Sequence, residues 1–244
     1  AENTIAVLTV TATDADAGSS LSLSITGGAD QALFSIDGST GALTFDSAPD
    51  FESPADADTD NDYIVEIMVS DGVNSTGQTI TVTVDDINDV APVVTASQEF
   101  SIDENSTNGT VVGTITATDA DGPGLQDWTI TGGNTDGAFA LNTSTGQLTV
   151  ANINALDRET TTSFNLTITV SDGVNTSASE EVVIDLDDVN DNNPVFQNTP
   201  YTVSTAENAA IGATIFTVEA TDADAGVNAQ ILYSISGGNT NGDY

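Results

Sequence analysis

The sequence predicts an all-β protein made of tandem β-sandwich domains, and three observations support this prediction. Short motifs recur along the 244 residues at intervals of roughly 100 residues, which is the length of one domain and not of a short solenoid unit. Apolar and polar residues alternate in many short stretches, as they do in half-buried strands. Gly, Asn, Asp and Ser interrupt these stretches about every 8–12 residues, as the turns of a sandwich do.

The internal repeat is the strongest of these signals. A Glu-Asn pair begins at residues 2, 104 and 207, and Thr-Asp-Ala-Asp begins at residues 13, 118 and 221. Gly-Gly pairs begin at residues 27, 132 and 237. We therefore expect three repeats, at residues 1–91, 92–193 and 194–244. Tyr244 aligns with Phe139, so the third repeat holds only the first half of a sandwich, and about 50 residues cannot close a core alone. We expect this half to be poorly ordered, completed by further residues or supported by its neighbour.

Period-2 alternation places the strands in each repeat. Thr and Val are abundant, which suits strands, and no 3.6-residue period persists. Trp128 lies in one of the alternating stretches, where we expect it to pack in the core. In chain order, the expected strands include residues 10–12, 21–25, 63–69, 80–84, 115–117, 164–170, 182–186 and 218–220.

The charge balance excludes several classes of partner. The chain carries 38 Asp and Glu but a single Lys or Arg, Arg158, so its formal net charge is −37. Nucleic acids and anionic membrane surfaces need basic residues, so we expect neither as a partner. There is no apolar run of 18 residues that could span a bilayer. Without Cys or His there is neither a disulfide scaffold nor a thiolate or imidazole metal site.

Two acidic stretches follow alternating apolar runs and mark the junctions between repeats. They are DDINDVAP at residues 85–92 and DDVNDNNP at residues 187–194. Each contains three carboxylates within five residues, and two such charges 4–5 Å apart repel by roughly 3–4 kcal/mol at an effective dielectric constant near 20. Oxygen donors without sulfur or imidazole suit a hard cation, above all Ca²⁺. We therefore expect calcium at both junctions.

On these motifs the chain resembles the cadherin repeat family. The second repeat matches the family pattern throughout, with EN at 104–105, DAD at 119–121, LDRE at 156–159, DG at 172–173 and DVNDNNP at 188–194. The third contributes DADAGVNA at 222–229, and the first contributes FSID at 34–37 and TGAL at 40–43. Several spaced motifs that agree over the whole chain are a specific signal. The richness in Thr, Ala, Gly and Asp is more similar to prokaryotic cadherin-like arrays than to animal ones.

The resemblance implies a Greek-key, immunoglobulin-like β-sandwich for each repeat, with the third truncated, and about three Ca²⁺ ions at each complete boundary. It also implies the ligands of these ions. At the first boundary they are Glu2, Asp50, Glu52, Asp86, Asn88, Asp89, Asp119, Asp121 and Asp172, with the carbonyl oxygens of Ile87 and Val90. At the second boundary they are Glu104, Asp157, Glu159, Asp188, Asn190, Asp191, Asp222 and Asp224, with the carbonyl oxygens of Val189, Asn192 and Asn228.

Two features of this sequence depart from the family pattern, and the first repeat also has an insertion relative to the second. DFE at residues 50–52 replaces Asp-Arg-Glu, and GPG at residues 122–124 replaces a Gly-x-Asn segment, so no carbonyl ligand is assigned there. The first repeat also carries an insertion, PADADTDND at residues 54–62, whose alternating Asp resembles the start of a helical-hand calcium loop. Its sixth and twelfth positions are Asn61 and Ile67 instead of the Gly and Glu of such a loop. We therefore expect a solvated acidic loop.

Together these features predict calcium-binding extracellular repeats that form a calcium-rigidified spacer or adhesion module of a larger surface or secreted protein. The expected partners are calcium and the neighbouring repeats, and a cadherin-like protein or a polysaccharide are further candidates. The alternative is a polysaccharide- or protein-binding module attached to a secreted hydrolase. We expect no enzyme activity in this segment, because no His or Cys is present and no base is available to activate a Ser or Thr.

Overall fold

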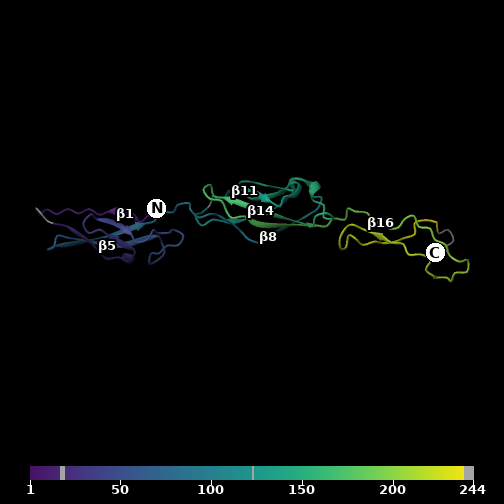
Figure 1. Cartoon of the computed structure of the whole chain (residues 1–244), viewed down its shortest axis with the longest axis horizontal. Coiled ribbons are helices and arrows are strands. Elements are labelled where there is room, and N and C mark those ends of the chain that lie inside the picture. The colour runs from purple at the N-terminus through teal and green to yellow at the C-terminus, as the bar shows by residue number, and fades with distance from the viewer. Residues whose placement is uncertain (17–19, 123, 239–244) are drawn as a thin grey trace. The chain divides into compact units, whose positions relative to one another are not determined.

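The computed structural model describes residues 1–16, 20–122 and 124–238, and the chain forms two compact units. The first contains residues 1–91 and 119–122, and the second contains residues 92–118 and 124–238. Both units are built from strands, and the helical segments of the described residues are three short 3-10 turns (Figure 1). None of these turns is long or apolar enough to cross a membrane. The prediction of an all-β chain is confirmed.

The first unit contains two antiparallel sheets of three strands each. Their strand orders are β1-β4-β3 and β2-β5-β6. The core lies between them, where Tyr63, Val65 and Ile67 of β5 pack with Leu43 and Phe45. The elements are β1 (Ala6–Thr9), β2 (Ser22–Gly27), η1 (Gln31–Leu33), β3 (Phe34–Ile36), β4 (Ala42–Phe45), β5 (Asp62–Ser70) and β6 (Ser75–Thr83).

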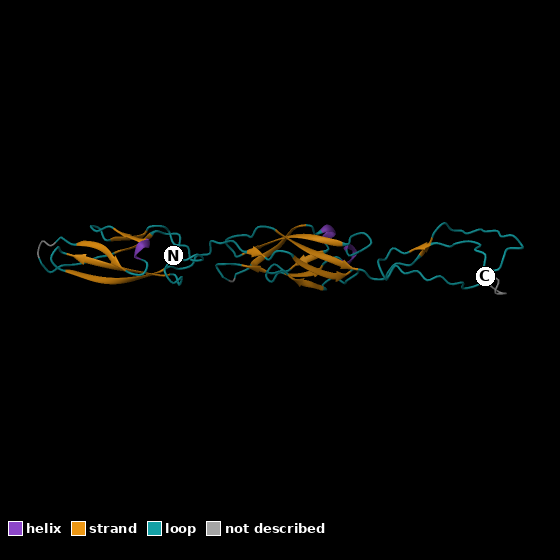
Figure 2. Cartoon of the chain, turned by 90° about the horizontal axis from the view of Figure 1, so that it is seen from below, coloured by secondary structure: helices purple, strands orange, loops and turns teal. Residues whose placement is uncertain are grey.

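The second unit contains a sheet of order β11-β14-β15-β8 and a sheet of order β12-β13-β9. Its strands form two layers (Figure 2), and the chain passes repeatedly from one sheet to the other, as in a Greek-key sandwich. Strand β8 pairs in parallel with β15. A short pair of β7 and β10 lies outside these sheets. The elements are β7 (Val93–Val94), β8 (Gln98–Asp103), β9 (Val111–Thr114), β10 (Ala117–Thr118), β11 (Gln126–Gly132), η2 (Thr135–Gly137), β12 (Phe139–Leu141), β13 (Gln147–Val150), η3 (Ile153–Ala155), β14 (Ser163–Ser171) and β15 (Glu180–Asp187).

The core of the second unit follows the alternation of β14. Phe164, Leu166, Ile168 and Val170 are all buried, whereas the residues between them are exposed or half-buried. Trp128 of β11 is buried in the same core. The predicted strands at 63–69 and 164–170 and the predicted core position of Trp128 are therefore confirmed.

The predicted strand at 10–12 is wrong, and of the predicted strand at 115–117 only Ala117 lies in a strand, β10. Strands β1 and β9 end at Thr9 and Thr114, one residue before Val10 and Ile115. Register shifts in the pairing of β1 with β4 and of β9 with β13 interrupt the period of two, as a bulge does. The amides of Val10 and Ile115 instead donate to the carbonyls of two glycines, Gly41 at 2.8 Å and Gly146 at 2.9 Å.

The Ser-Thr-Gly motif that recurs in the sequence has a structural explanation at these two glycines. Gly41 and Gly146 both have positive φ, 75° and 68°. A Cβ atom at these positions would lie 2.1 Å from the Val10 carbonyl oxygen and 2.8 Å from the Ile115 carbonyl oxygen, respectively. Only glycine accommodates both the left-handed backbone and this close approach.

The C-terminal part of the second unit, residues 194–238, forms little regular structure. Its described strands are β16 (Val195–Phe196) and β17 (Ala220–Thr221), which pair with each other. Large apolar residues such as Phe196, Phe216 and Leu232 are exposed, so the described residues of this part do not close a core. The predicted strand at 218–220 is therefore only partly correct, and Tyr244 lies outside the described residues.

Truncation of the buried Leu166 in β14 tests the core of the second unit. We expect Leu166→Ala to lower the free energy of unfolding by about 2–5 kcal/mol, because it removes apolar contacts and leaves a cavity. Trp128, the single Trp of the chain, reports unfolding of this unit by its fluorescence in denaturant. The exposed Val174→Ala is the control and should change the free energy by less than about 0.5 kcal/mol. Similar losses in both variants would contradict this core assignment.

Candidate metal centres

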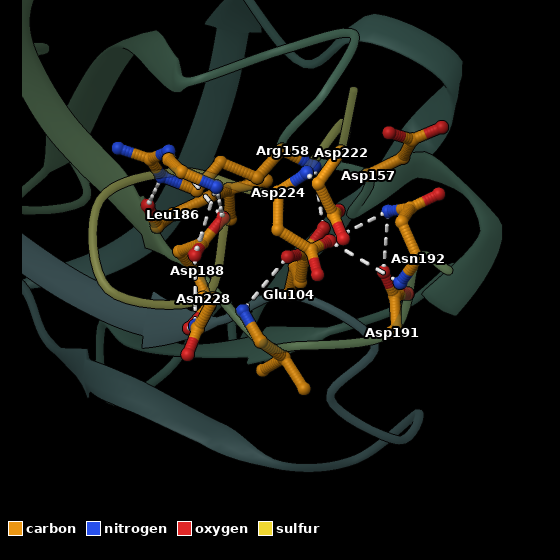
Figure 3. Close-up of polar contacts among 12 residues, drawn as sticks. Glu104, Asp157, Arg158, Leu186, Asp188, Asp191, Asn192, Asp222, Asp224 and Asn228 are labelled. Carbon is orange, nitrogen blue, oxygen red and sulfur yellow. Dashed lines mark hydrogen bonds and ion pairs between the residues drawn. The ribbon is translucent and has the colours of Figure 1, made fainter. Parts of the chain in front are cut away.

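Glu104 is fixed at the end of a strand and points into an acidic site of the second unit. Its amide donates to the Asp187 carbonyl at 3.0 Å, which extends the parallel ladder of β8 and β15 by one bond. Its side chain is only 2% exposed and accepts hydrogen bonds from the backbone amides of Arg158 (2.6 Å) and Val189 (2.9 Å) (Figure 3). One carboxylate thus ties together three segments that are distant in the sequence.

Glu2 occupies the equivalent position in the first unit. Its amide donates to the Asp85 carbonyl at 3.0 Å. Its buried carboxylate accepts from the amides of Phe51 (2.8 Å) and Ile87 (2.9 Å). Phe51 therefore donates at the same point as Arg158 in the second unit, and the Asp-Phe-Glu variant keeps the arrangement of Asp-Arg-Glu.

The Asn of each Glu-Asn pair has a role that sequence reasoning missed. Asn3 and Asn105 have φ values of 58° and 57°, in the left-handed region that Asn tolerates better than most residues. In this conformation their side-chain amides donate to the linker acids Asp89 and Asp191, respectively. The recurrence of Asn after Glu was the available signal, and the reason for it is a backbone conformation combined with a hydrogen bond.

The first unit gathers five carboxylates in two overlapping clusters. Oxygen atoms of Glu2, Asp50 and Glu52 lie within 4.8 Å of one another, and so do oxygen atoms of Glu52, Asp86 and Asp121. Both carboxylate oxygens of Glu52 and the Oδ1 atom of Asp121 are buried without a hydrogen-bond partner. Buried polar atoms are rarely left in this state, so these oxygens call for a partner that the described residues do not supply.

The pKa values of two carboxyl groups at this site are raised above their ordinary values. Burial, with smaller contributions from the charges of Glu2 and Asp121, raises the pKa of Glu52 to about 7. Burial and the charges of Asp121, Glu2 and Asp89 also raise the pKa of Asp86. Each shift has the sign expected when anions are brought together with too few donors.

Strand-end and linker residues complete the first site. The amide of Val90 donates to the Asp121 Oδ2 atom at 2.7 Å, and the amide of Asp121 donates to Asp119 at 3.3 Å. Asp172 lies in the other unit, where its buried carboxylate accepts from the amides of Val174 and Asn175, both at 2.6 Å. Pro123, within the Gly-Pro-Gly departure, lies outside the described residues.

The second unit repeats this acidic arrangement. Oxygen atoms of Glu104, Glu159 and Asp188 lie within 4.8 Å of one another. The pKa of Glu159 is raised by burial and by the charges of Glu104, Asp191 and Asp157. Unlike Glu104, Asp157 is exposed, and its Oδ1 atom accepts from a backbone amide in its own turn.

Asp188 is the best-connected carboxylate of the second site. It pairs with the Nη1 atom of Arg158 at 3.6 Å, and the Arg158 Nε atom donates to the Leu186 carbonyl at 2.8 Å. The Asp188 carboxylate also accepts hydrogen bonds from the Ala225 amide at 3.0 Å and from the side-chain amide of Asn228 at 2.8 Å (Figure 3). The linker is thereby connected directly to the segment that begins the third repeat.

Asp224 brings an unpartnered anionic atom to the same site. Its side chain is 5% exposed, and its Oδ1 atom accepts from the backbone amide (3.2 Å) and the side-chain amide (2.8 Å) of Asn192. Its Oδ2 atom is buried without a partner. Asp222 accepts the Asp224 amide at 3.1 Å, and the Asn228 carbonyl accepts the side-chain amide of Asn190 at 3.3 Å.

The donor set suits a hard divalent cation. Within the described residues, both sites offer only carboxylate, amide and carbonyl oxygens, which are the ligands that Ca²⁺ takes. The orphaned oxygens of Glu52, Asp121 and Asp224 fit such an ion, because a cation can satisfy several of them at once.

Comparison with known families agrees with this arrangement. The family model described as "Cadherin domain" matches residues 1–85, 98–187 and 201–244. "Protocadherin Fat 4" of Mus musculus is 34% identical over 243 residues, which are 98% of this chain and 5% of that protein. "Protocadherin-like wing polarity protein stan" of Drosophila melanogaster is 35% identical over 193 residues, which are 78% of this chain and 5% of that protein. The chain thus spans about one twentieth of the length of these relatives.

Solved structures that resemble this chain are also cadherins. The crystal structure of mouse Cadherin-23 EC22-24 superimposes with a TM-score of 0.69 and 27% identity, covering 94% of this chain and 74% of that one. Extracellular cadherin domains 3-6 of Protocadherin Gamma B2 give a TM-score of 0.66 and 28% identity, covering 94% of this chain and 53% of that one. The relatives and solved structures named here are cadherins or protocadherins, and the matched part of Protocadherin Gamma B2 consists of extracellular cadherin domains. The chain belongs to the cadherin family and is a segment of extracellular cadherin repeats.

Proposed function

We propose that the two acidic sites bind calcium and that the ions hold adjoining cadherin repeats in a fixed arrangement. The observation that carries this proposal is the set of buried carboxylate oxygens without hydrogen-bond donors, on Glu52, Asp121 and Asp224. Each belongs to a cluster or segment that contains further acids, and the whole chain has a single basic side chain. A divalent cation is the partner that removes this deficit of positive charge.

The residues of the second site would supply ligands from four segments of the chain. Glu104 comes from the end of β8, and Glu159 from the loop before β14. Asp188 lies in the linker, and Asp224 lies in the segment after β17. An ion bound among these oxygens would tie repeat, linker and next repeat together, which supports a role for the metal in the order of the joint.

The repeat boundaries and the stoichiometry belong to the same proposal. We place the repeats at residues 1–91, 92–193 and 194–244, with about three ions at each complete boundary. The remaining ligands are the acids, amide side chains and carbonyls that the cadherin resemblance implies, including Asp172 at the first boundary. Affinity should lie in the range of extracellular modules, about 10⁻⁴–10⁻³ M.

In the longer protein, this segment would serve as a calcium-stiffened spacer or adhesion module. Neighbouring repeats and calcium are its immediate partners, and a second cadherin-like protein is a candidate partner in trans. The cadherin relatives give no support to the alternative of a polysaccharide-binding module on a secreted hydrolase.

Calcium should raise the melting temperature, and Glu159→Gln should reduce the rise. At a calcium concentration ten times the dissociation constant, each independent site contributes about 1.4 kcal/mol, which corresponds to several degrees for a domain of this size. Burial and the charges of neighbouring anions raise the pKa of Glu159, so Glu159→Gln should not lower the melting temperature of the calcium-free protein. Scanning calorimetry with EDTA and with calcium measures both effects.

The matched control for this experiment is Glu99→Gln, because Glu99 is an exposed glutamate on β8 outside the acidic clusters. It should leave the calcium-induced rise unchanged. Identical melting curves with and without calcium in the unsubstituted protein would contradict the proposed function. A calcium response that Glu159→Gln leaves intact would remove Glu159 from the ligand set.

Without calcium, we expect stability to fall as the pH rises from about 4.5 to about 7. Folded Glu52 has a pKa of about 7 against an ordinary value of 4.5, so it binds more protons in the folded state than in the unfolded state across this window. Raising the pH therefore favours the unfolded state. The groups whose pKa is lowered, such as Asp37, act only below their ordinary value of 3.8.

Melting temperatures in EDTA at pH 5 and pH 7.5 measure this dependence. Glu52→Gln cannot ionise at this position and should flatten it, whereas Glu99→Gln should not. If the melting temperature of the unsubstituted protein rose between pH 5 and pH 7.5, ionisation of Glu52 would not destabilise the folded state, and this prediction would be wrong.

A further inference from the structure

We propose that the inserted loop, residues 54–62 between β4 and β5, binds one additional calcium ion inside the first repeat, separate from the ions of the junctions. Carboxylate oxygens of Asp56, Asp58 and Asp60 lie within 4.8 Å of one another. They follow at alternate positions, which is the spacing of the first three ligands in a helical-hand calcium loop. Acidic groups alone are common on surfaces, so the argument depends on what else surrounds them.

The first acid of the loop is buried, contrary to the expectation of a solvated loop. Asp56 is only 4% exposed. Its Oδ2 atom accepts the amide of Asp60 at 2.9 Å, but its Oδ1 atom is buried and has no hydrogen-bond partner. A buried, unpartnered carboxylate oxygen within a cluster of two further acids is costly unless a cation binds there.

The loop is held in place by contacts that do not use the three acids. Asp30, itself buried, accepts the amides of Ala57 and Ile64, both at 2.7 Å. The amide of Ala55 donates to the hydroxyl of Tyr63 at 3.1 Å. The loop is therefore ordered by the sandwich beneath it, and a bound ion would not have to supply all of the ordering free energy.

Asn61 supplies the turn that glycine provides at the sixth position of a helical-hand loop. Its φ is 66°, in the left-handed region that such a turn requires. Its side-chain amide donates to the Phe51 carbonyl at 3.1 Å, and its buried Oδ1 atom has no partner. Ile67 at the twelfth position is a core residue of β5, so the bidentate acid of a helical-hand loop is absent and binding should be weaker than in such loops.

The carboxylates of Asp56, Asp58 and Asp60 repel one another in the loop. The charge of Asp60, followed by burial and the neighbouring Asp56, raises the pKa of Asp58. Burial acts to raise the pKa of Asp56 as well, but hydrogen bonds from backbone amides outweigh it and lower the pKa overall. A divalent cation among the three carboxylates would relieve this repulsion.

The second repeat has no counterpart of this loop, so the site should occur once in the chain. Glu52 precedes Tyr63 by 11 residues, whereas the equivalent Glu159 precedes Phe164 by only 5 residues. The intervening residues of the second repeat, 160–163, contain no acid.

Native mass spectrometry of the whole chain in calcium tests the proposal. The double variant Asp58→Asn/Asp60→Asn changes the two exposed acids, and Asn keeps an oxygen that can accept the Asp62 amide, as Asp60 does now. We expect it to bind one calcium ion fewer than the unsubstituted protein. Hydrogen exchange should also show that calcium no longer protects the peptide covering residues 53–62.

The matched control is Asp127→Asn/Asp136→Asn, which removes two charges from exposed positions of the second repeat where positive φ suits Asn. It should keep the full number of ions. Circular dichroism establishes that both variants remain folded. An unchanged ion count together with unchanged protection in Asp58→Asn/Asp60→Asn would overturn this proposal. Glu159→Gln tests the junction ions separately, so either proposal can fail without the other.

Discussion

The arrangement of both acidic sites depends on carboxylates that the protein itself cannot neutralise. Glu104 and Glu2 each receive two backbone amides, but Glu52 receives no hydrogen bond in its buried position. The single basic side chain, Arg158, pairs with one acid of the second site only. Where donors are absent, the pKa of a buried acid rises, as it does for Glu52. In the proposed function, an ion from the solution supplies the missing positive charge.

The sandwich brings these carboxylates together at the ends of its strands. The parallel pairing of β8 with β15 ends where the linker begins, so that Glu104 lies beside the acids that follow β15. The loop before β14 brings Glu159 to the same acidic site, beside Glu104 and Asp188. Because the core beneath these ends is closed by apolar residues, the strands cannot move apart to separate the charges. The packing that stabilises the sandwich therefore also holds the carboxylates at its end close enough to repel one another.

Sequence reasoning recovered those parts that local pattern determines. The strands at 63–69 and 164–170 followed from strict alternation, and the acidic clusters followed from motifs that recur once per repeat. The early strand endings before Val10 were not predictable, because bulges break the period of two. The burial of Asp56 was equally hidden, since it depends on Asp30, which is distant in the sequence and holds the loop against the sandwich. Alternating acids look the same whether a loop is solvated or anchored.

The most direct test of the account measures the distance between repeats with spin labels. The chain contains no Cys, so labels on Ser39→Cys and Thr143→Cys, both at exposed positions of the first and second sandwiches, would be the only ones present. Double electron–electron resonance should give a broad distance distribution in EDTA and a narrow one in millimolar calcium, because shared ions fix the linker between the labelled repeats. A distribution of the same width in both conditions would contradict the claim that calcium orders the joint.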